Sequence, residues 1–152
     1  MKQICSFYLD DKMYGLDILL IQEIVRCQEI TVVPHSPVFV DGLINLRGQI
    51  VVAVNLRNLL EINSERIVVD PINIILSSKG EFVSLIADRA GDVFDFGSEP
   101  ILAPPKSLKG NAVRVIKGIH KLEQALVHIL DPEAIFEIRS KSESKHLSQI
   151  SG

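Results

Sequence analysis

The sequence predicts an all-β fold with short helices, in which two small barrels share an apolar seam. The chain of 152 residues is a succession of short apolar segments separated by turn residues, a pattern that is typical of small barrels. Much of the chain also repeats at a constant spacing. Each copy is too small to form a stable core by itself, so we expect the two copies to pack against each other.

The elements of the first half are predicted from apolar runs bounded by turn residues and prolines. The Arg47-Gly48 pair joins two strands as a tight hairpin turn, and Asn55 caps the short helix that follows them. The apolar run within residues 17–24 is too short for its periodicity to separate helix from strand. In chain order the expected elements are strands 4–9 and 13–16, a helical turn entering a strand over 17–24, an extended Pro-bearing loop over 31–37, strands 43–46 and 49–54, and a helix over 56–60.

The second half repeats this arrangement. A polar turn over 77–80 joins its first two strands, and Asp131-Pro132, a cap residue followed by Pro, predicts the start of the last helix. In chain order we expect strands 72–76 and 81–87, a Pro-bearing loop over 97–105, strands 113–119 and 125–130, a helix that ends at residue 138, and a mobile C-terminal tail, rich in Ser and Lys, over 139–152.

An internal duplication relates the two halves. Gly42-Leu43 corresponds to Gly118-Ile119, and the apolar positions that follow keep the same spacing of 76 residues without a gap. The alternative is a chance likeness between two hairpins. We expect one domain over 1–138, with subdomains at about 10–70 and about 71–138. The N-terminal strand is a candidate member of the second subdomain.

Composition and charge exclude several kinds of partner. With 16 Lys and Arg against 19 Asp and Glu, the chain lacks the positive field that nucleic-acid binding requires. Its N-terminus has no apolar signal region, and no apolar run approaches the roughly 20 residues of a membrane span. Cys5 and Cys27 are isolated thiols, as is usual in a reducing compartment. We therefore expect a cytoplasmic protein without direct membrane insertion.

The sequence contains no catalytic or metal-binding set. Asp95-Phe96-Gly97 spells the magnesium-binding tripeptide of protein kinases, but the other kinase motifs are absent, so we expect a turn at a strand end. Asp10-Asp11 is interpreted as a solvated turn, and His120 and His128 as structural side chains. The cysteines and histidines lack the paired spacing of a zinc site. We expect no enzyme activity, no cofactor and no metal.

One polar feature distinguishes the first half from the second. The hairpin Asn45-Leu46-Arg47-Gly48 aligns with the different residues Lys121-Leu122-Glu123-Gln124 in the second copy. The first half also places Glu23 within an apolar segment, where a carboxylate needs a partner such as an Arg. Spacing alone leaves two interpretations open: Glu23 pairs with Arg47, or each is separately solvated.

Several runs together resemble the CheW family of chemotaxis coupling proteins. The similarity extends from about residue 6 to about residue 136, and the order and spacing of its fragments are more specific than any one of them. They are Tyr14-Gly15-Leu16-Asp17-Ile18, Ile21-Gln22-Glu23-Ile24-Val25, Ile30-Thr31-Val32-Val33-Pro34, Val40-Asp41-Gly42-Leu43-Ile44-Asn45-Leu46-Arg47-Gly48-Gln49-Ile50 and Asn55-Leu56-Arg57.

The resemblance implies two intertwined five-stranded, SH3-like β-barrels and a non-catalytic adaptor. Such an adaptor joins the cytoplasmic tips of methyl-accepting chemoreceptors to the regulatory domain of the histidine kinase CheA, and reaches membrane-associated receptor arrays through these partners. The residues that the resemblance assigns to coupling are Ile21, Glu23, Val25, Asn45, Arg47 and Gly48, with Glu23 and Arg47 as an ion pair. The kinase contact is expected on apolar residues at a barrel end of the first subdomain.

Two other functions stay open on the sequence. The chain could act as a CheW-like scaffold in another receptor-controlled two-component pathway, such as surface motility, or as a small-molecule-binding β-barrel. A deep pocket with convergent titratable groups would favour the barrel. A shallow apolar groove beside Glu23 and Arg47 would favour the adaptor.

Overall fold

The computed structural model describes residues 2–140, and ten strands dominate them. The all-β class with short helices is confirmed. The elements, in chain order, are β1 (Gln3–Leu9), β2 (Lys12–Asp17), the 3-10 turn η1 (Ile18–Leu20), β3 (Ile21–Arg26), β4 (Val40–Leu46), β5 (Gln49–Asn55), α1 (Leu56–Leu59), β6 (Ile72–Ser78), β7 (Glu81–Ala87), β8 (Arg89–Asp95), α2 (Asn111–Val115), β9 (Ile116–Lys121), β10 (Leu126–Leu130) and a helix over residues 132–140.

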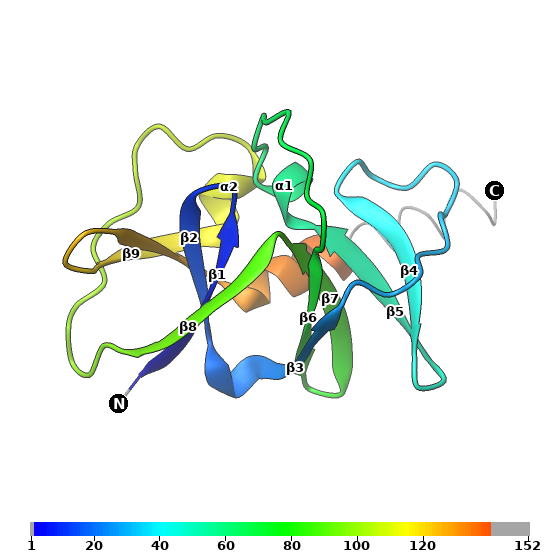
Figure 1. The fold of residues 1–152 in the computed structure, drawn as a ribbon, viewed down its shortest axis with the longest axis horizontal. Coiled ribbons are helices and arrows are strands. Elements are labelled where there is room, and N and C mark those ends of the chain that lie inside the picture. The colour runs from blue at the N-terminus through cyan, green and yellow to red at the C-terminus, as the bar shows by residue number, and fades with distance from the viewer. Residues whose placement is uncertain (1, 141–152) are drawn as a thin grey trace.

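The strands form two five-stranded sheets, which Figure 1 shows on opposite sides of the molecule. One sheet has the order β8-β1-β2-β10-β9 and the other the order β3-β6-β7-β5-β4. Each sheet contains one parallel pair, β2 with β10 and β5 with β7, among antiparallel neighbours. The expectation of two intertwined five-stranded barrels is therefore confirmed.

The two sheets exchange strands between the halves of the chain. If β1 to β5 are matched in order with β6 to β10, each sheet order becomes the other, so the topology follows the internal repeat strand for strand. However, β2 lies in the sheet of β8 to β10, while β6 and β7 lie in the sheet of β3 to β5. Each sheet therefore draws strands from both halves of the chain. Exchange lets each half contribute apolar faces to both barrels.

Each barrel is closed by a short bridge between the segment after one edge strand and the opposite edge strand. Thr31, which follows β3, exchanges two hydrogen bonds of 2.8 Å with Leu43 of β4, and Leu102, which follows β8, pairs in the same way with Ile119 of β9. A side chain at Gly42 would collide with the Thr31 backbone, and one at Gly118 with the Leu102 carbonyl. The duplicated glycine thus permits the close approach that closes each barrel.

The apolar core has one shared part and two separate parts. The shared cluster unites residues of the first sheet such as Phe7 and Leu16 with residues of the second such as Ile74 and Leu85, and the helix over 132–140 packs onto it. Separate clusters around Ile129 and around Ile44, Val51 and Ile75 fill the two barrel interiors. The predicted apolar seam between the barrels is this shared cluster.

Three elements differ from the sequence prediction. Strand β8 was not expected, because it is an edge strand with little apolar alternation; its pairing with β1 specifies it. Residues 111–115, expected as part of a strand, form α2, since Ala112 and Val115 enter the shared core on one helical face. The last helix continues past residue 138 through the buried Arg139 to Ser140, residues that the sequence placed in the tail. The rest of that expected mobile tail, 141–152, lies outside the described residues.

Candidate functional site

The structure brings Glu23 and Arg47 together in a two-point ion pair. Arg47 Nη1 lies 2.8 Å from Glu23 Oε1, and Arg47 Nη2 lies 2.7 Å from Glu23 Oε2. The Arg47 side chain is 72% exposed and that of Glu23 is 21% exposed. Since β3 and β4 are the two edges of their sheet, this pair links one edge to the hairpin turn that follows the other.

The conformation of the hairpin turn explains how Arg47 reaches Glu23. Arg47 and Gly48 have φ angles of 52° and 84°, which is the type I′ pattern of two-residue hairpins. Gly48 donates its amide to Asn45 Oδ1 at 2.9 Å, which holds the turn in place. An Arg is unusual at the first turn position, where Asn, Asp and Gly are preferred. Its two-point contact with Glu23 holds the Arg47 side chain against β3.

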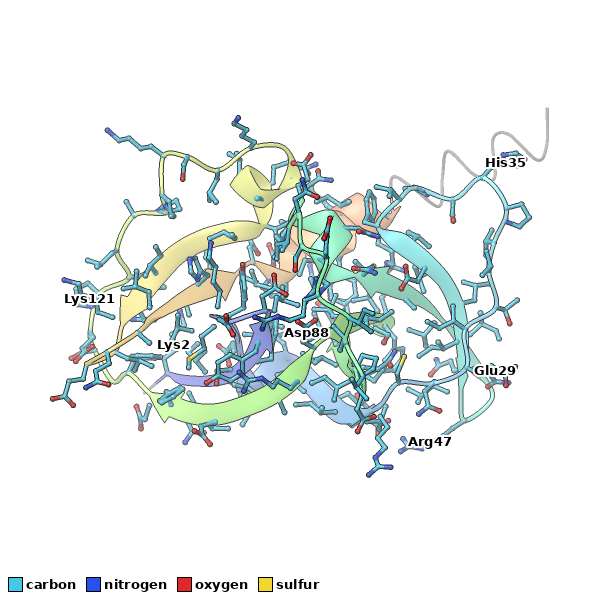
Figure 2. All side chains as sticks on the ribbon, turned by 45° about the horizontal axis from the view of Figure 1, so that its top comes forward. Lys2, Glu29, His35, Arg47, Asp88 and Lys121 are labelled. Carbon is cyan, nitrogen blue, oxygen red and sulfur yellow. The ribbon has the colours of Figure 1, made fainter. Side chains whose placement is uncertain are left out.

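The other predicted site residues lie on the same edge strand. Ile21, Glu23 and Val25 alternate along β3 and are half-buried, while Gln22 and Ile24 between them are exposed. A bulge at the start of the strand shifts its register against β6 between Ile21 and Glu23. The structure therefore places all six predicted residues on β3 or the β4–β5 hairpin of one sheet, and Figure 2 shows Arg47 at the outer end of this region.

The sequence interpretation missed a charged cluster between the two sheets. Arg57 of α1 donates from Nε and Nη2 to the two carboxylate oxygens of Asp88 at 2.9 and 2.8 Å, and its Nη2 also contacts Asp10 Oδ1. The Asp10 amide donates to Asp88 Oδ2 at 2.7 Å. Figure 2 shows Asp88 near the centre of the molecule. Asp10 is therefore not the solvated turn residue that the sequence suggested.

Each charge in this cluster stabilises the others in their ionised form. The hydrogen bond with Asp88 raises the pKa of Arg57. Burial opposes ionisation of Asp88, but the hydrogen bonds from Arg57 and from the Asp10 amide outweigh it, so the pKa of Asp88 is lowered. Two features of the sequence could have indicated this cluster. Asp88 is a polar residue directly after the buried strand β7, and Arg57 lies in a four-residue helix. Only the tertiary fold brings them together.

The histidines and cysteines form no reactive site among residues 2–140. His120 is buried and stacks on Phe96 with ring centroids 4.0 Å apart, and burial lowers its pKa. Burial raises the pKa of the Cys5 and Cys27 thiols, which keeps them in the less reactive protonated form. The described residues contain no group of three or more side chains that could hold a metal ion. Within the same range no helix is both long and apolar enough to span a bilayer.

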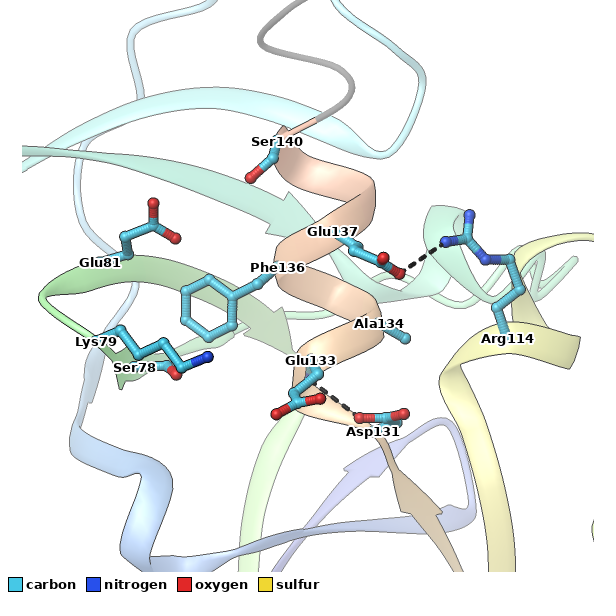
Figure 3. A pocket seen from close by; sticks show the side chains of 10 residues that line it. All are labelled: Ser78, Lys79, Glu81, Arg114, Asp131, Glu133, Ala134, Phe136, Glu137 and Ser140. Atoms are coloured by element: carbon cyan, nitrogen blue, oxygen red, sulfur yellow. Dashed lines mark hydrogen bonds and ion pairs between the residues drawn. The ribbon is translucent and has the colours of Figure 1, made fainter.

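A groove of about 790 Å³ runs beside the helix over 132–140, as Figure 3 shows. Two of its carboxylates are occupied by ion pairs, Glu137 with Arg114 at 3.2 Å and Glu81 with Arg139 at 2.9 Å. Asp131 accepts a hydrogen bond from the Glu133 amide at the helix start. These contacts stabilise the helix and leave no convergent acid–base pair in the groove.

The same fold and sequence pattern occur in known proteins. The family model described as a CheW-like domain matches residues 3–140 of this chain. The chain belongs to the CheW-like family. Chemotaxis protein CheW of Thermotoga maritima is 30% identical to it over 135 residues, which are 89% of this chain and 87% of that protein. Chemotaxis protein CheW of Treponema pallidum is 26% identical over 138 residues, 88% of this chain and 81% of that protein.

A solved structure shows the same architecture. The crystal structure of the scaffolding protein TtCheW from Thermoanaerobacter tengcongensis matches with a TM-score of 0.76 and 31% sequence identity, over 86% of this chain and 88% of that one. The resemblance seen in the sequence is therefore confirmed. CheW-like proteins are non-catalytic scaffolds of chemotaxis, and this membership makes the chain a scaffold protein rather than an enzyme.

Proposed function

We propose that this CheW-like chain is the adaptor that couples the cytoplasmic tips of chemoreceptors to the regulatory domain of the histidine kinase CheA. The observation that carries the proposal is the Glu23–Arg47 ion pair, because it joins the family's most distinctive hairpin to the edge strand β3. An adaptor must hold two contact surfaces in a fixed relation, and the shared core between the sheets gives it that rigidity. It would act in the cytoplasm and reach receptor arrays through its partners.

The receptor contact is proposed on β3 and the β4–β5 hairpin. Ile21 and Val25 are half-buried, so they offer apolar surface that a partner helix can finish covering. Arg47 is largely exposed and keeps donor groups available at the rim, while Asn45 and Gly48 fix the turn that carries it. An apolar centre with a charged rim is the usual anatomy of a protein interface.

The kinase contact is proposed on the apolar residues that the same barrel exposes. Val32 and Val38 are each 75% exposed in the segment between β3 and β4, in the barrel closed by the Thr31–Leu43 bridge. Exposed apolar side chains grouped on one structural unit mark surfaces for protein partners. A CheA regulatory domain that docks there leaves the Glu23–Arg47 pair accessible to the receptor.

The test is binding of purified chain to immobilised CheA regulatory domain and, separately, to receptor-tip fragments from the same genome. Arg47→Glu places two carboxylates opposite each other, so we expect receptor binding to weaken by about tenfold or more while kinase binding is retained. Val38→Asp should show the opposite pattern. Lys117→Glu, an exposed change of the same charge on β9, serves as the matched control.

Each outcome decides between the assignments. Loss of both interactions in Arg47→Glu with an intact fold would contradict the separation of the two surfaces. Absence of wild-type binding to every chemotaxis receptor tip, together with binding to the receptor of another two-component pathway, would move the scaffold into that pathway.

A further inference from the structure

A cavity of about 510 Å³ lies on the side of the molecule formed by the β1–β2 turn, the end of α1, the loop over 97–110 and α2. Figure 1 shows α1 and α2 close to this turn. The volume is within the usual range of small-molecule pockets, roughly 300–1,000 Å³. Its walls combine polar and apolar surface, and the apolar part comes from Leu9, Leu60, Ile62, Pro105, Leu108, Ala112 and Ile116.

Tyr14 supplies a hydrogen-bond donor to this cavity. The residue as a whole is only 4% exposed, and its hydroxyl makes no hydrogen bond within residues 2–140. The hydroxyl is not one of the buried polar atoms that lack a partner, so it is open to the cavity, where water or a ligand can accept from it. Burial and the charge of Asp10 raise the pKa of Tyr14, so the hydroxyl stays protonated and remains a donor. The hydroxyl is therefore free to donate to a molecule that enters the cavity.

His128 places an acceptor beside this donor. The Tyr14 and His128 ring centroids are 5.0 Å apart, and both side chains line the cavity. His128 Nδ1 lies 3.0 Å from the Met13 carbonyl oxygen. Because a carbonyl only accepts, Nδ1 carries the proton in this contact, which leaves Nε2 as the ring nitrogen available to a ligand. Tyr14 and His128 therefore give the cavity two neighbouring polar groups.

The rim of the cavity carries one available charge of each sign. Asp10 and Asp11 also line it, but each is neutralised by an Arg, through the contacts to Arg57 and Arg66. Lys12 and Glu61 line the cavity without an ion-pair partner elsewhere in the described part of the chain. A ligand that pairs with both residues carries an anionic and a cationic group.

We propose that this cavity binds a small zwitterion of the α-amino-acid type, with a mainly apolar side chain that ends in a polar group. The carboxylate pairs with Lys12, the ammonium pairs with Glu61, the apolar part contacts Leu60 and Ile62, and the polar tip pairs with Tyr14 and His128. The site is separate from β3 and the β4–β5 hairpin, and the proposal does not depend on the adaptor function.

The test uses four related probes that differ by one group each. L-Tyrosine has every proposed element, L-phenylalanine lacks the polar tip, tyramine lacks the carboxylate, and desaminotyrosine lacks the ammonium group. Each is titrated into the isotope-labelled full-length chain up to its solubility limit, and amide shifts are followed by NMR. We expect saturable shifts at the cavity residues with L-tyrosine, and weaker binding of each other probe by roughly three- to tenfold.

Three conservative variants assign each contact. Tyr14→Phe should abolish the preference for L-tyrosine over L-phenylalanine. Lys12→Met should abolish the preference for L-tyrosine over tyramine, and Glu61→Gln should abolish the preference for L-tyrosine over desaminotyrosine. The matched controls Tyr8→Phe, Lys109→Met and Glu65→Gln change residues outside the cavity lining and should leave all three preferences intact.

Two results would overturn the proposal. One is the absence of saturable shifts at the cavity with all four probes on the wild-type chain, which requires no variant to fold. The other is binding whose preferences are unchanged in all three cavity variants. We expect receptor and kinase binding by the same variants to be unaffected in either case, so failure here is distinguishable from failure of the adaptor proposal.

Discussion

Arg57 and Asp88 form a two-point ion pair, at 2.9 and 2.8 Å, that connects α1 to the end of β7 and, through Asp10, to the β1–β2 turn of the other sheet. The side chains of Arg57 and Asp88 are only 15% and 11% exposed. The pair therefore contributes to holding the two barrels in register, in addition to the apolar core that they share.

Removing Arg57 should destabilise the fold considerably. Arg57→Met leaves the carboxylates of Asp88 and Asp10 partly buried without a cation, and we expect the free energy of unfolding to fall by about 2–4 kcal/mol. Urea denaturation monitored by circular dichroism measures this. Arg66→Met breaks the exposed pair with Asp11, which water screens, and should cost clearly less. Equal losses in both variants would contradict the structural role of the cluster.

The same cluster predicts acid sensitivity. Because the pKa of Asp88 is lowered in the folded state, its contribution to stability is complete above the unfolded value of 3.8 and is lost as the pH falls through the folded value. Asp88→Asn should therefore be less stable than the wild type near neutral pH and approach it below about pH 4. Denaturant midpoints across this range provide the measurement; a constant difference between the two proteins would refute the assignment.

His120 predicts a second pH dependence at higher pH. Burial lowers its pKa below the ordinary value of 6.5, and the folded structure provides no hydrogen-bond partner for either ring nitrogen among residues 2–140. Its contribution is therefore complete above the unfolded pKa, and stability falls as the pH drops below about 6.5. His120→Leu should lose this dependence, as seen in urea midpoints at about pH 7.5 and about pH 5.5. The control variant His35→Asn, which replaces an exposed histidine, should retain this pH dependence.

Replacing Gly48 should destabilise the fold through backbone conformation alone. Its φ of 84° is unfavourable for side chains with a Cβ, while no atom lies within 4 Å of the position that a Cβ would take. Gly48→Val should destabilise the fold by about 1–2 kcal/mol without steric overlap. Gly48→Asn, which tolerates this conformation, is the control and should cost clearly less in the same denaturation assay. A Val variant as stable as the wild type would refute this.

The Glu23–Arg47 pair should matter more for binding than for stability. Since Arg47 is 72% exposed, Arg47→Ala should lower the free energy of unfolding by less than about 1 kcal/mol. A double variant, Glu23→Arg with Arg47→Glu, exchanges the two charges. If the pair acts by orienting the hairpin, this variant should bind the receptor better than either single variant. Binding that stays lost in the double variant would instead indicate direct contact of Arg47 with the partner.

Local features of the fold were predictable because they depend on neighbouring residues. The hairpin turn at Arg47-Gly48, the cap at Asn55 and the start of the last helix after Asp131 all appear as predicted. The helical turn that enters β3 was also expected from its position after Asp17, whose side chain accepts from the Leu19 amide. For the candidate site, the sequence identified Glu23 and Arg47 but left their pairing open, since 24 residues separate them.

By itself the sequence determined the class of fold, the internal repeat, the turn chemistry and the family, because each is encoded in residue types and short spacings. Only the tertiary structure decided that β2 and the β6–β7 hairpin exchange between sheets, that the exposed β8 pairs with β1, and that Arg57 meets Asp88. These features arise from burial of apolar faces that belong to distant segments. The local sequence pattern indicates which face of a strand or helix is buried. Which distant segment packs against that face depends on the packing of the whole chain.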